Sequence, residues 1–134
     1  MQGFSITTLE NGLKIIHKEL KGTNIITSNI VYQVGSRDEI PGQTGLAHML
    51  EHMVFKPTKK DLKAKIDSGA MQFERETGCL LNANTWKSRT AYYFSFPKEY
   101  LNRALSIEAD RMQNVVLSDK EFLPERTNVL SEFD

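Results

Sequence analysis

The 134-residue sequence predicts an α+β domain with a mainly antiparallel sheet and helices packed on one face of that sheet. Three observations predict this class. Strand-like segments fill the first third of the chain, strand and helix patterns are mixed after it, and turn residues join neighbouring strands. The length is close to the commonest size of one domain, and such a chain can bury a core without disulfides.

Strand patterns dominate before residue 35. Segments 4–9 and 13–20 flank Glu10-Asn11-Gly12. Asn-Gly between apolar stretches is typical of a hairpin turn, because both residues tolerate positive φ. Segment 24–34 is rich in Ile, Val, Thr and Tyr, which favour a longer strand. Segment 35–43 is polar and contains a Pro-Gly pair, so it is predicted to be a loop.

The middle of the chain predicts helices. Thr44 can cap a helix over 46–55, and Pro57 bounds that helix. Segment 59–67 predicts a second, more exposed helix, whereas the pattern of 71–77 is ambiguous.

The last third predicts a hairpin followed by helices. Segments 80–86 and 90–96 have strand character, and apolar residues at helical spacing predict an amphipathic helix over 98–113. Segment 118–121 fits a capping box. Pro124 inside the same helix would remove a hydrogen bond at a cost of about 3 kcal/mol, so we expect a new helix to start near Pro124.

Composition excludes several classes of protein. Apolar residues make up 40% and charged residues 25%, which excludes a disordered or collagen-like chain. Equal numbers of basic and acidic residues disfavour nucleic acid and anionic membranes as partners. The apolar runs are too short for a membrane span, and no secretory signal pattern opens the sequence. This slightly favours the cytoplasm, although a processed chain of the periplasm or an organelle would look the same. The single Cys79 excludes an internal disulfide and a multi-cysteine metal site.

The stretch His48-Met49-Leu50-Glu51-His52 carries the clearest chemical signal. On a helix, residues four apart share a face, so His48 and His52 can aim two imidazoles at one point. Glu51 lies beside them. Two neutral imidazoles suit a zinc ion, and a nearby carboxylate suits a base that acts on metal-bound water. The HxxEH order is one of the catalytic zinc signatures, although a match this short also arises by chance on helix surfaces.

A catalytic zinc site needs a third protein ligand and one open position. Glu125 and Glu132 are the candidates, because a spacing of seven residues puts both on one helical face. The alternative is that they are two solvated glutamates on a helix surface.

At these residues the sequence resembles the inverzincin zinc metallopeptidases, the family of pitrilysin, insulin-degrading enzyme and the mitochondrial processing peptidase. The resemblance runs from about Leu9 to the last residue. Besides HxxEH, its motifs are Gly35-Ser36-Arg37-Asp38-Glu39, Gly42-Gln43-Thr44-Gly45-Leu46-Ala47, Met53-Val54-Phe55-Lys56, Asn82-Ala83-Asn84-Thr85, Thr90-Ala91-Tyr92-Tyr93, and Glu125-Arg126 through Glu132.

The resemblance implies a role for each matching residue. His48, His52 and Glu132 would bind one Zn²⁺, and Glu51 would be the general base. Glu125 would be a supporting catalytic residue near the metal. The edge strand that pairs with an extended peptide would consist of Asn82, Ala83, Asn84 and Thr85. An edge strand has unpaired N–H and C=O groups, which makes this role physically reasonable.

The resemblance also implies how the whole protein is organised. Residues 1–134 would be the N-terminal zinc-binding part of a peptidase lobe in a longer chain, with the zinc site between the HxxEH helix and the C-terminal helix. The expected partners are a peptide substrate and a homologous second half or partner subunit, and turnover is expected to need that remainder. Pro124 departs from the family pattern, which usually continues a helix at this point.

The expected function is a zinc endopeptidase acting on peptides or unfolded segments. A non-catalytic peptide-binding or assembly subunit of a two-lobed peptidase is the main alternative, and the complete set His48, Glu51, His52 and Glu132 argues against it. A structural zinc domain is the second alternative. It is disfavoured by Glu51, a carboxylate that is not expected to bind the metal.

Overall fold

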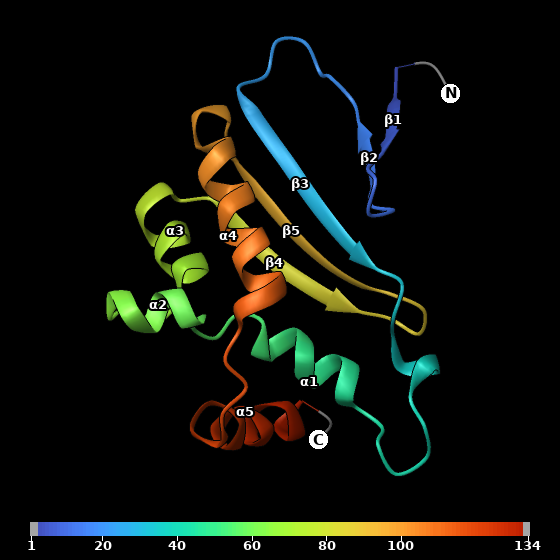
Figure 1. The fold of residues 1–134 in the computed structure, drawn as a ribbon, viewed down its shortest axis with the longest axis vertical. Coiled ribbons are helices and arrows are strands. Elements are labelled where there is room, and N and C mark those ends of the chain that lie inside the picture. The colour runs from blue at the N-terminus through green and yellow to red at the C-terminus, as the bar shows by residue number, and fades with distance from the viewer. Residues whose placement is uncertain (1–2, 133–134) are drawn as a thin grey trace.

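A three-stranded antiparallel sheet forms the centre of the molecule in the computed structural model, which describes residues 3–132 (Figure 1). The strands are β3 (Ile25–Tyr32), β4 (Leu80–Thr85) and β5 (Thr90–Pro97), in the order β3-β5-β4. The predicted α+β class is confirmed. The last two residues of the family resemblance lie outside the described range.

Strand β5 pairs antiparallel with β3 on one side and with β4 on the other. Thr90 of β5 is opposite both Tyr32 of β3 and Thr85 of β4. This order leaves β4 with a strand partner on one side within the described part of the chain. The predicted hairpin over 80–96 is therefore present, and β4 is an edge strand as expected.

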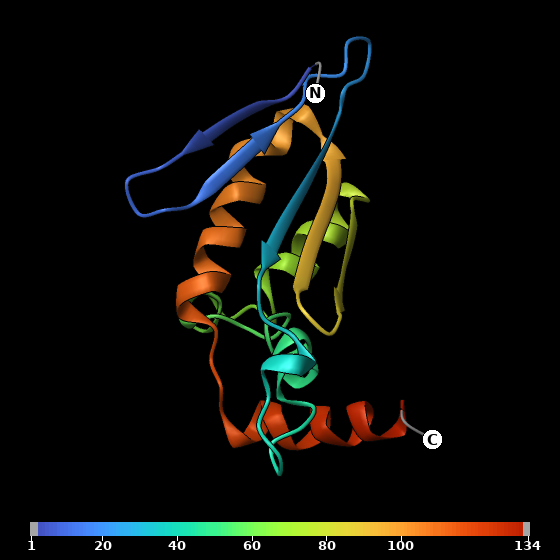
Figure 2. The same cartoon turned by 90° about the vertical axis from the view of Figure 1, so that its right-hand side faces the viewer.

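The first hairpin forms a small sheet of its own. It consists of β1 (Ser5–Thr8) and β2 (Lys14–His17), and Gly12 in the turn has φ of 85°. The Asn-Gly signal therefore predicted the hairpin correctly, but both strands are shorter than expected. Both are exposed along their whole length, and Figure 2 shows the hairpin at the end of the molecule opposite to α1 and α5.

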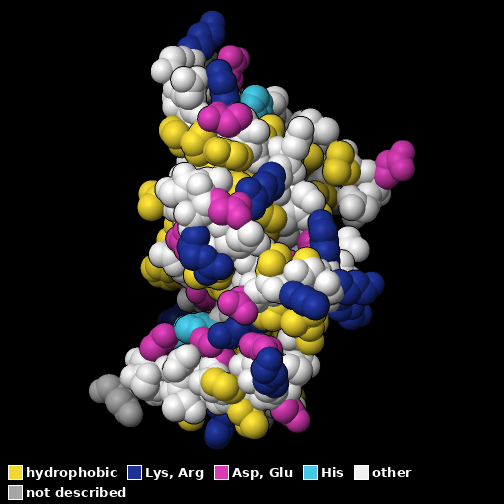
Figure 3. Space-filling view, turned by 90° about the vertical axis from the view of Figure 1, so that its left-hand side faces the viewer, with side chains coloured by type: hydrophobic (Ala, Val, Ile, Leu, Met, Phe, Trp, Pro, Cys, Tyr) yellow, Lys and Arg dark blue, Asp and Glu magenta, His cyan; other side chains and the backbone are white. Residues whose placement is uncertain are grey.

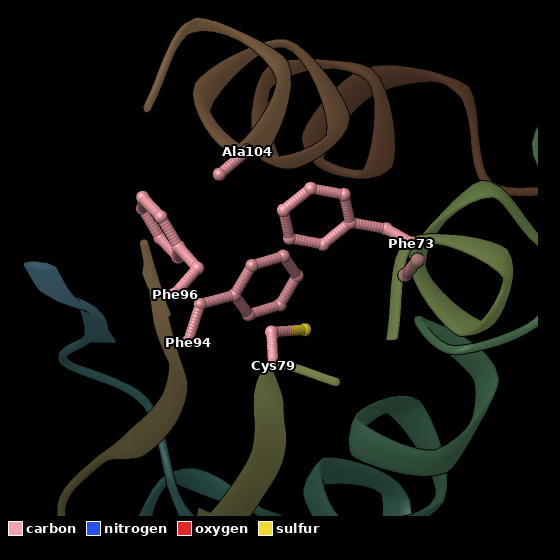
Figure 4. Packing of buried hydrophobic residues seen from close by; sticks show 6 residues of the cluster. Phe73, Cys79, Phe94, Phe96 and Ala104 are labelled. Carbon is pink, nitrogen blue, oxygen red and sulfur yellow. The ribbon is translucent and has the colours of Figure 1, made fainter. Parts of the chain in front are cut away.

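Two helices cover one face of the central sheet: α3 (Gly69–Thr77) and α4 (Leu101–Asn114) (Figure 1). The core lies beneath them, where the rings of Phe73, Phe94 and Phe96 point toward one another beside Cys79 and Ala104 (Figure 4). The Phe73 ring centroid is 6.0 Å from that of Phe94 and 6.1 Å from that of Phe96. Such aromatic pairs contribute beyond their buried area, which fixes α3 on the sheet.

The ambiguous segment 71–77 is helical because both of its ends are capped. The Ser68 side chain accepts a hydrogen bond from the backbone N–H of Met71, and Gly78 ends α3 with φ of 66°. The preceding helix α2 (Lys59–Ala64) is shorter than predicted, since Lys65 adopts φ of 58° and stops it. Two single-turn 3₁₀ helices, Ser36–Asp38 and Lys98–Tyr100, complete the connections.

The expected restart of the last helix is wrong. Helix α5 (Asp119–Ser131) is continuous through Pro124. The predicted capping box is also absent, since the Ser118 side chain makes no cap hydrogen bond. Pro124 removes only one backbone hydrogen bond, whereas the continuous helix buries Glu125 and Val129. Packing therefore outweighs the local preference of proline.

Helix α1 (Leu46–Met53) lies beyond the end of the central sheet, and α5 packs against it (Figures 1 and 2). This arrangement brings the HxxEH stretch next to the C-terminal helix. Within residues 3–132, every helix is too short or too polar to cross a bilayer.

Candidate metal centre

The start of α1 is held by Glu39 and not by Thr44, so the predicted cap is wrong. Gly45 occupies the N-cap position with φ of 92° and offers no side chain. The two carboxylate oxygens of Glu39 accept hydrogen bonds of 2.8 Å from the backbone N–H groups of Gly45 and Ala47. These bonds satisfy amides that a helix start otherwise leaves unpaired, and the negative charge suits the helix dipole. They fix the turn that carries His48.

Three side chains from two helices converge at one point. The Nε2 atoms of His48 and His52, on α1, are 3.2 Å apart. Glu132 at the end of α5 places Oε2 3.3 Å from Nε2 of His48 and Oε1 3.7 Å from Nε2 of His52. Among the described residues, these three form a group whose possible ligand atoms all lie within 4.8 Å of one another.

The spacing of the possible ligand atoms on these three side chains is close to the spacing around a zinc ion. Tetrahedral Zn²⁺ with bonds of about 2.0–2.1 Å separates its ligand atoms by about 3.3 Å. The two imidazole nitrogens are 3.2 Å apart, Oε2 of Glu132 lies 3.3 Å from that of His48, and Oε1 of Glu132 lies 3.7 Å from that of His52. Two imidazole nitrogens and one carboxylate oxygen are also a common ligand set of catalytic zinc, which leaves the fourth position open.

Glu125 sets the orientation of the His52 ring. Its Oε1 lies 2.8 Å from Nδ1 of His52. Because a carboxylate only accepts, Nδ1–H is the donor, and the Nε2 lone pair of the neutral ring faces His48 and Glu132. Burial by itself would raise the pKa of Glu125, but hydrogen bonds from Lys56 and His52 outweigh it and hold the pKa below its usual range. Glu125 therefore holds the His52 ring and does not belong to the converging group of three.

Glu51 shares a hollow with the converging group. The hollow has a volume of about 320 Å³, and its lining consists of His48, Glu51, His52, Phe55, Asn82 and Glu132. Glu51 is only 8% exposed, so its carboxylate needs a partner. The partner is Thr85, whose hydroxyl donates a 2.5 Å hydrogen bond to Oε2.

The predicted edge-strand residues take different positions around this hollow. Asn82 lines it, and its Oδ1 accepts a 2.8 Å hydrogen bond from the N–H of Ala83. The Asn84 Oδ1 is buried and has no hydrogen-bond partner in the described part of the chain. Thr85 directs its hydroxyl to Glu51, so its side chain holds the acidic residue and is not free for a peptide.

Charged side chains gather at this end of the molecule. Figure 3 shows histidine, acidic and basic side chains clustered where the lower, helical end meets the rest of the protein. The sequence did not predict two contacts of the site: the ion pair of Lys56 with Glu125, and the hydrogen bond from the Thr85 hydroxyl to Glu51. No local pattern indicates such long-range pairs, although both residues lie in motifs that carry the family resemblance.

Comparisons with known proteins agree on the class, a zinc protease domain. An uncharacterised zinc protease of Rickettsia bellii is 37% identical over 131 residues, which cover 98% of this chain and 31% of the relative. The mitochondrial-processing peptidase subunit beta of Rattus norvegicus is 39% identical over 128 residues, which cover 95% of this chain and 25% of the relative. The crystal structure of a protease from Helicobacter pylori superposes with a TM-score of 0.86 at 35% identity, covering 96% of this chain and 30% of that one.

The family follows from a match over most of the chain. The model of the insulinase family, peptidase family M16, matches residues 14–134. The chain belongs to this family. It spans between a quarter and a third of the length of the two relatives named above.

Proposed function

We propose that this chain is the zinc-binding part of a peptidase lobe in a longer zinc endopeptidase, which hydrolyses peptide bonds in peptides or unfolded segments. The observation that carries the proposal is the convergence of His48, His52 and Glu132 at zinc spacing beside the carboxylate of Glu51. The zinc protease names of the relatives support the same chemistry.

The ligand roles are assigned to His48, His52 and Glu132. A zinc ion held there would lower the pKa of a bound water to about 7 and would polarise a scissile carbonyl. Glu51 lines the same hollow, so its carboxylate is the group that accepts a proton from the attacking water and passes it to the leaving amine. The hydrogen bond from Thr85 fixes one oxygen of Glu51 and leaves the other available for this transfer.

The substrate would bind as an added strand along β4. This proposal is supported by the edge position of β4 in the described sheet and by Asn82, which lies in the hollow with Glu51. The Ala83 N–H donates a hydrogen bond to Oδ1 of the neighbouring Asn82, a contact that a peptide carbonyl can replace. Recognition through the backbone requires an extended substrate and makes few demands on its sequence.

Completion by a homologous second half or a partner subunit is part of the proposal. The hollow is lined from one side by α1, β4 and the end of α5, and Glu132 is 51% exposed. An active site that excludes water needs a further surface over these residues. The mitochondrial-processing peptidase relative is itself named as a subunit.

The substitution Glu51→Gln tests this function in the full-length protein together with any partner. The variant is expected to keep one zinc per site and to lose cleavage of an unfolded polypeptide by at least about 100-fold, because the proton acceptor is gone. Zinc content is measured by elemental analysis and cleavage by mass spectrometry. Glu10→Gln, at an exposed position in the first hairpin turn, is the matched control and should retain full activity.

Two results would contradict the proposal. Wild-type protein that binds no zinc would remove the metal chemistry, and full activity of Glu51→Gln would remove the assigned base. Zinc binding without any cleavage in the complete protein would favour the non-catalytic peptide-binding alternative.

A further inference from the structure

Lys56 connects the segment after α1 to the candidate metal centre. Its Nζ forms an ion pair with Oε2 of Glu125, whose Oε1 is bonded to Nδ1 of His52. The backbone N–H of Lys56 donates a 3.0 Å hydrogen bond to the carbonyl of Met53, the last residue of α1. The lysine is therefore fixed to the same helix that carries both histidines.

We propose that Lys56 is a positioning residue of the metal centre, which clamps one oxygen of Glu125 so that the other stays on Nδ1 of His52. The His52 ring then keeps Nε2 directed at the point where His48 and Glu132 converge. This inference rests on the proposed function, because it assigns Lys56 a role in the same zinc site.

The burial of Glu125 makes this clamp necessary. Its side chain is only 9% exposed, so water offers little compensation for the carboxylate charge. Each oxygen has its own donor: His52 holds Oε1, and Lys56 holds Oε2. The third contact, from Nδ2 of Asn128 to Oε2, is long at 3.5 Å. Without Lys56, Oε2 would keep this weak neutral contact from Asn128. The buried carboxylate would then rotate toward another donor to compensate its charge.

The consequence for His52 follows from the geometry. Rotation of the Glu125 carboxylate moves Oε1 away from Nδ1, and the imidazole loses the bond that fixes its orientation and tautomer. Groups that hold a metal-binding histidine in this way typically change metal affinity by about 10–100-fold when they are removed. Lys56 acts one step further out, so we expect a smaller effect of about five- to tenfold.

The sign of the effect separates this role from simple electrostatics. Lys56 is a cation close to a cation site, and removal of a like charge would by itself strengthen zinc binding. Positioning through Glu125 predicts the opposite result. A change in zinc affinity therefore identifies the mechanism by its direction alone.

The test compares zinc dissociation constants of the full-length protein, measured by competition with a chromophoric chelator. Lys56→Met is expected to bind zinc about five- to tenfold more weakly, and Lys56→Arg, which keeps charge and donors, should restore most of the affinity. Lys60→Met is the matched control, since Lys60 is an exposed lysine four residues further along, and its loss changes the net charge equally. Circular dichroism of the zinc-free proteins shows whether each variant is folded, and Lys56→Gln replaces Lys56→Met if the latter is not.

The same Lys56 substitution made in a Glu125→Gln variant tests whether Lys56 acts through Glu125. In Glu125→Gln protein, the further change Lys56→Met should no longer weaken zinc binding, because the carboxylate that Lys56 holds is gone and only the repulsion between like charges remains. Tighter or unchanged zinc binding by folded Lys56→Met would overturn the role of Lys56, as would an undiminished loss in the Glu125→Gln background. Failure of the wild-type protein to bind zinc is a separate outcome that overturns the proposed function itself.

Discussion

Glu108 and Arg111 form a buried ion pair on α4. Removing one partner should lower the free energy of unfolding far more than replacing both partners with apolar residues. Arg111 is 3% exposed, and its Nη2 donates a 2.6 Å hydrogen bond to Oε1 of Glu108. Its Cζ lies 5.2 Å from the ring centroids of Phe55, Tyr92 and Phe94. Nε and Nη1 of the same guanidinium are buried and have no hydrogen-bond partner among residues 3–132. The carboxylate of Glu108 is therefore the main compensation for this buried charge.

The magnitude follows from the burial of both charges. At a charge separation of about 4 Å and an effective dielectric constant of about 20, the attraction is about 4 kcal/mol. Glu108→Leu leaves the guanidinium uncompensated, so we expect the free energy of unfolding to fall by about 3–5 kcal/mol. The double variant Glu108→Leu/Arg111→Met buries no charge and should lie within about 2 kcal/mol of the wild type.

Urea unfolding of the single and double variants measures the coupling energy between the two residues. We expect at least about 3 kcal/mol for this pair. The pair Glu76–Arg103 is the matched control, because its N–O distance of 2.5 Å is similar but both side chains are 43% exposed. Exposed pairs contribute about 0–1 kcal/mol, so the control cycle should be nearly additive. Additive losses at Glu108 and Arg111 would refute the reasoning.

Three further changes probe other parts of the fold. Glu39→Ala removes the acceptor of two backbone N–H groups at the start of α1 and should cost about 1–3 kcal/mol in urea unfolding; equal stability of the variant would show that water replaces the carboxylate. Gly35→Ala should lower the melting temperature measured by calorimetry, because an added Cβ would lie 2.0 Å from the carbonyl oxygen of Trp86; an unchanged melting temperature would contradict this close approach. Burial raises the pKa of Tyr92 above its ordinary value of 10.0, so the unfolded chain loses this proton first and stability falls as pH rises above about 10. Tyr92→Phe should remove up to about 1.4 kcal/mol per pH unit of this slope in denaturation series, and equal slopes would contradict it.

Local patterns predicted the elements whose causes are local. The Asn-Gly turn marked the first hairpin, and apolar spacing marked α4 to within a few residues of its ends. The errors occur where distant residues decide. Glu39 reaches across a loop to cap α1, which left Thr44 without the predicted role. Helix α5 continues through Pro124 because it is packed against α1, and this contact is absent from any local window of sequence.

The candidate site divides in the same way. His48 and His52 were predicted from helical spacing, whereas Glu132 was one of two candidates until the family resemblance assigned it. The structure brings these three residues together and places Glu125 behind His52. The partnerships of Thr85 with Glu51 and of Lys56 with Glu125 join residues on different elements. Their donors and acceptors have no fixed sequence separation, so only the fold could reveal them.

The position of Glu132 at the exposed end of α5 has a consequence for how firmly that helix is held. Glu132 directly follows the last residue of α5 and reaches the histidines of α1. An ion shared by the two helices would act as a cross-link between segments far apart in the sequence, and its binding energy would add to the stability of their contact. Zinc binding at the centre and ordering of the last turn of α5 would then be coupled, so that each favours the other. Hydrogen exchange at the end of α5 would follow the free zinc concentration.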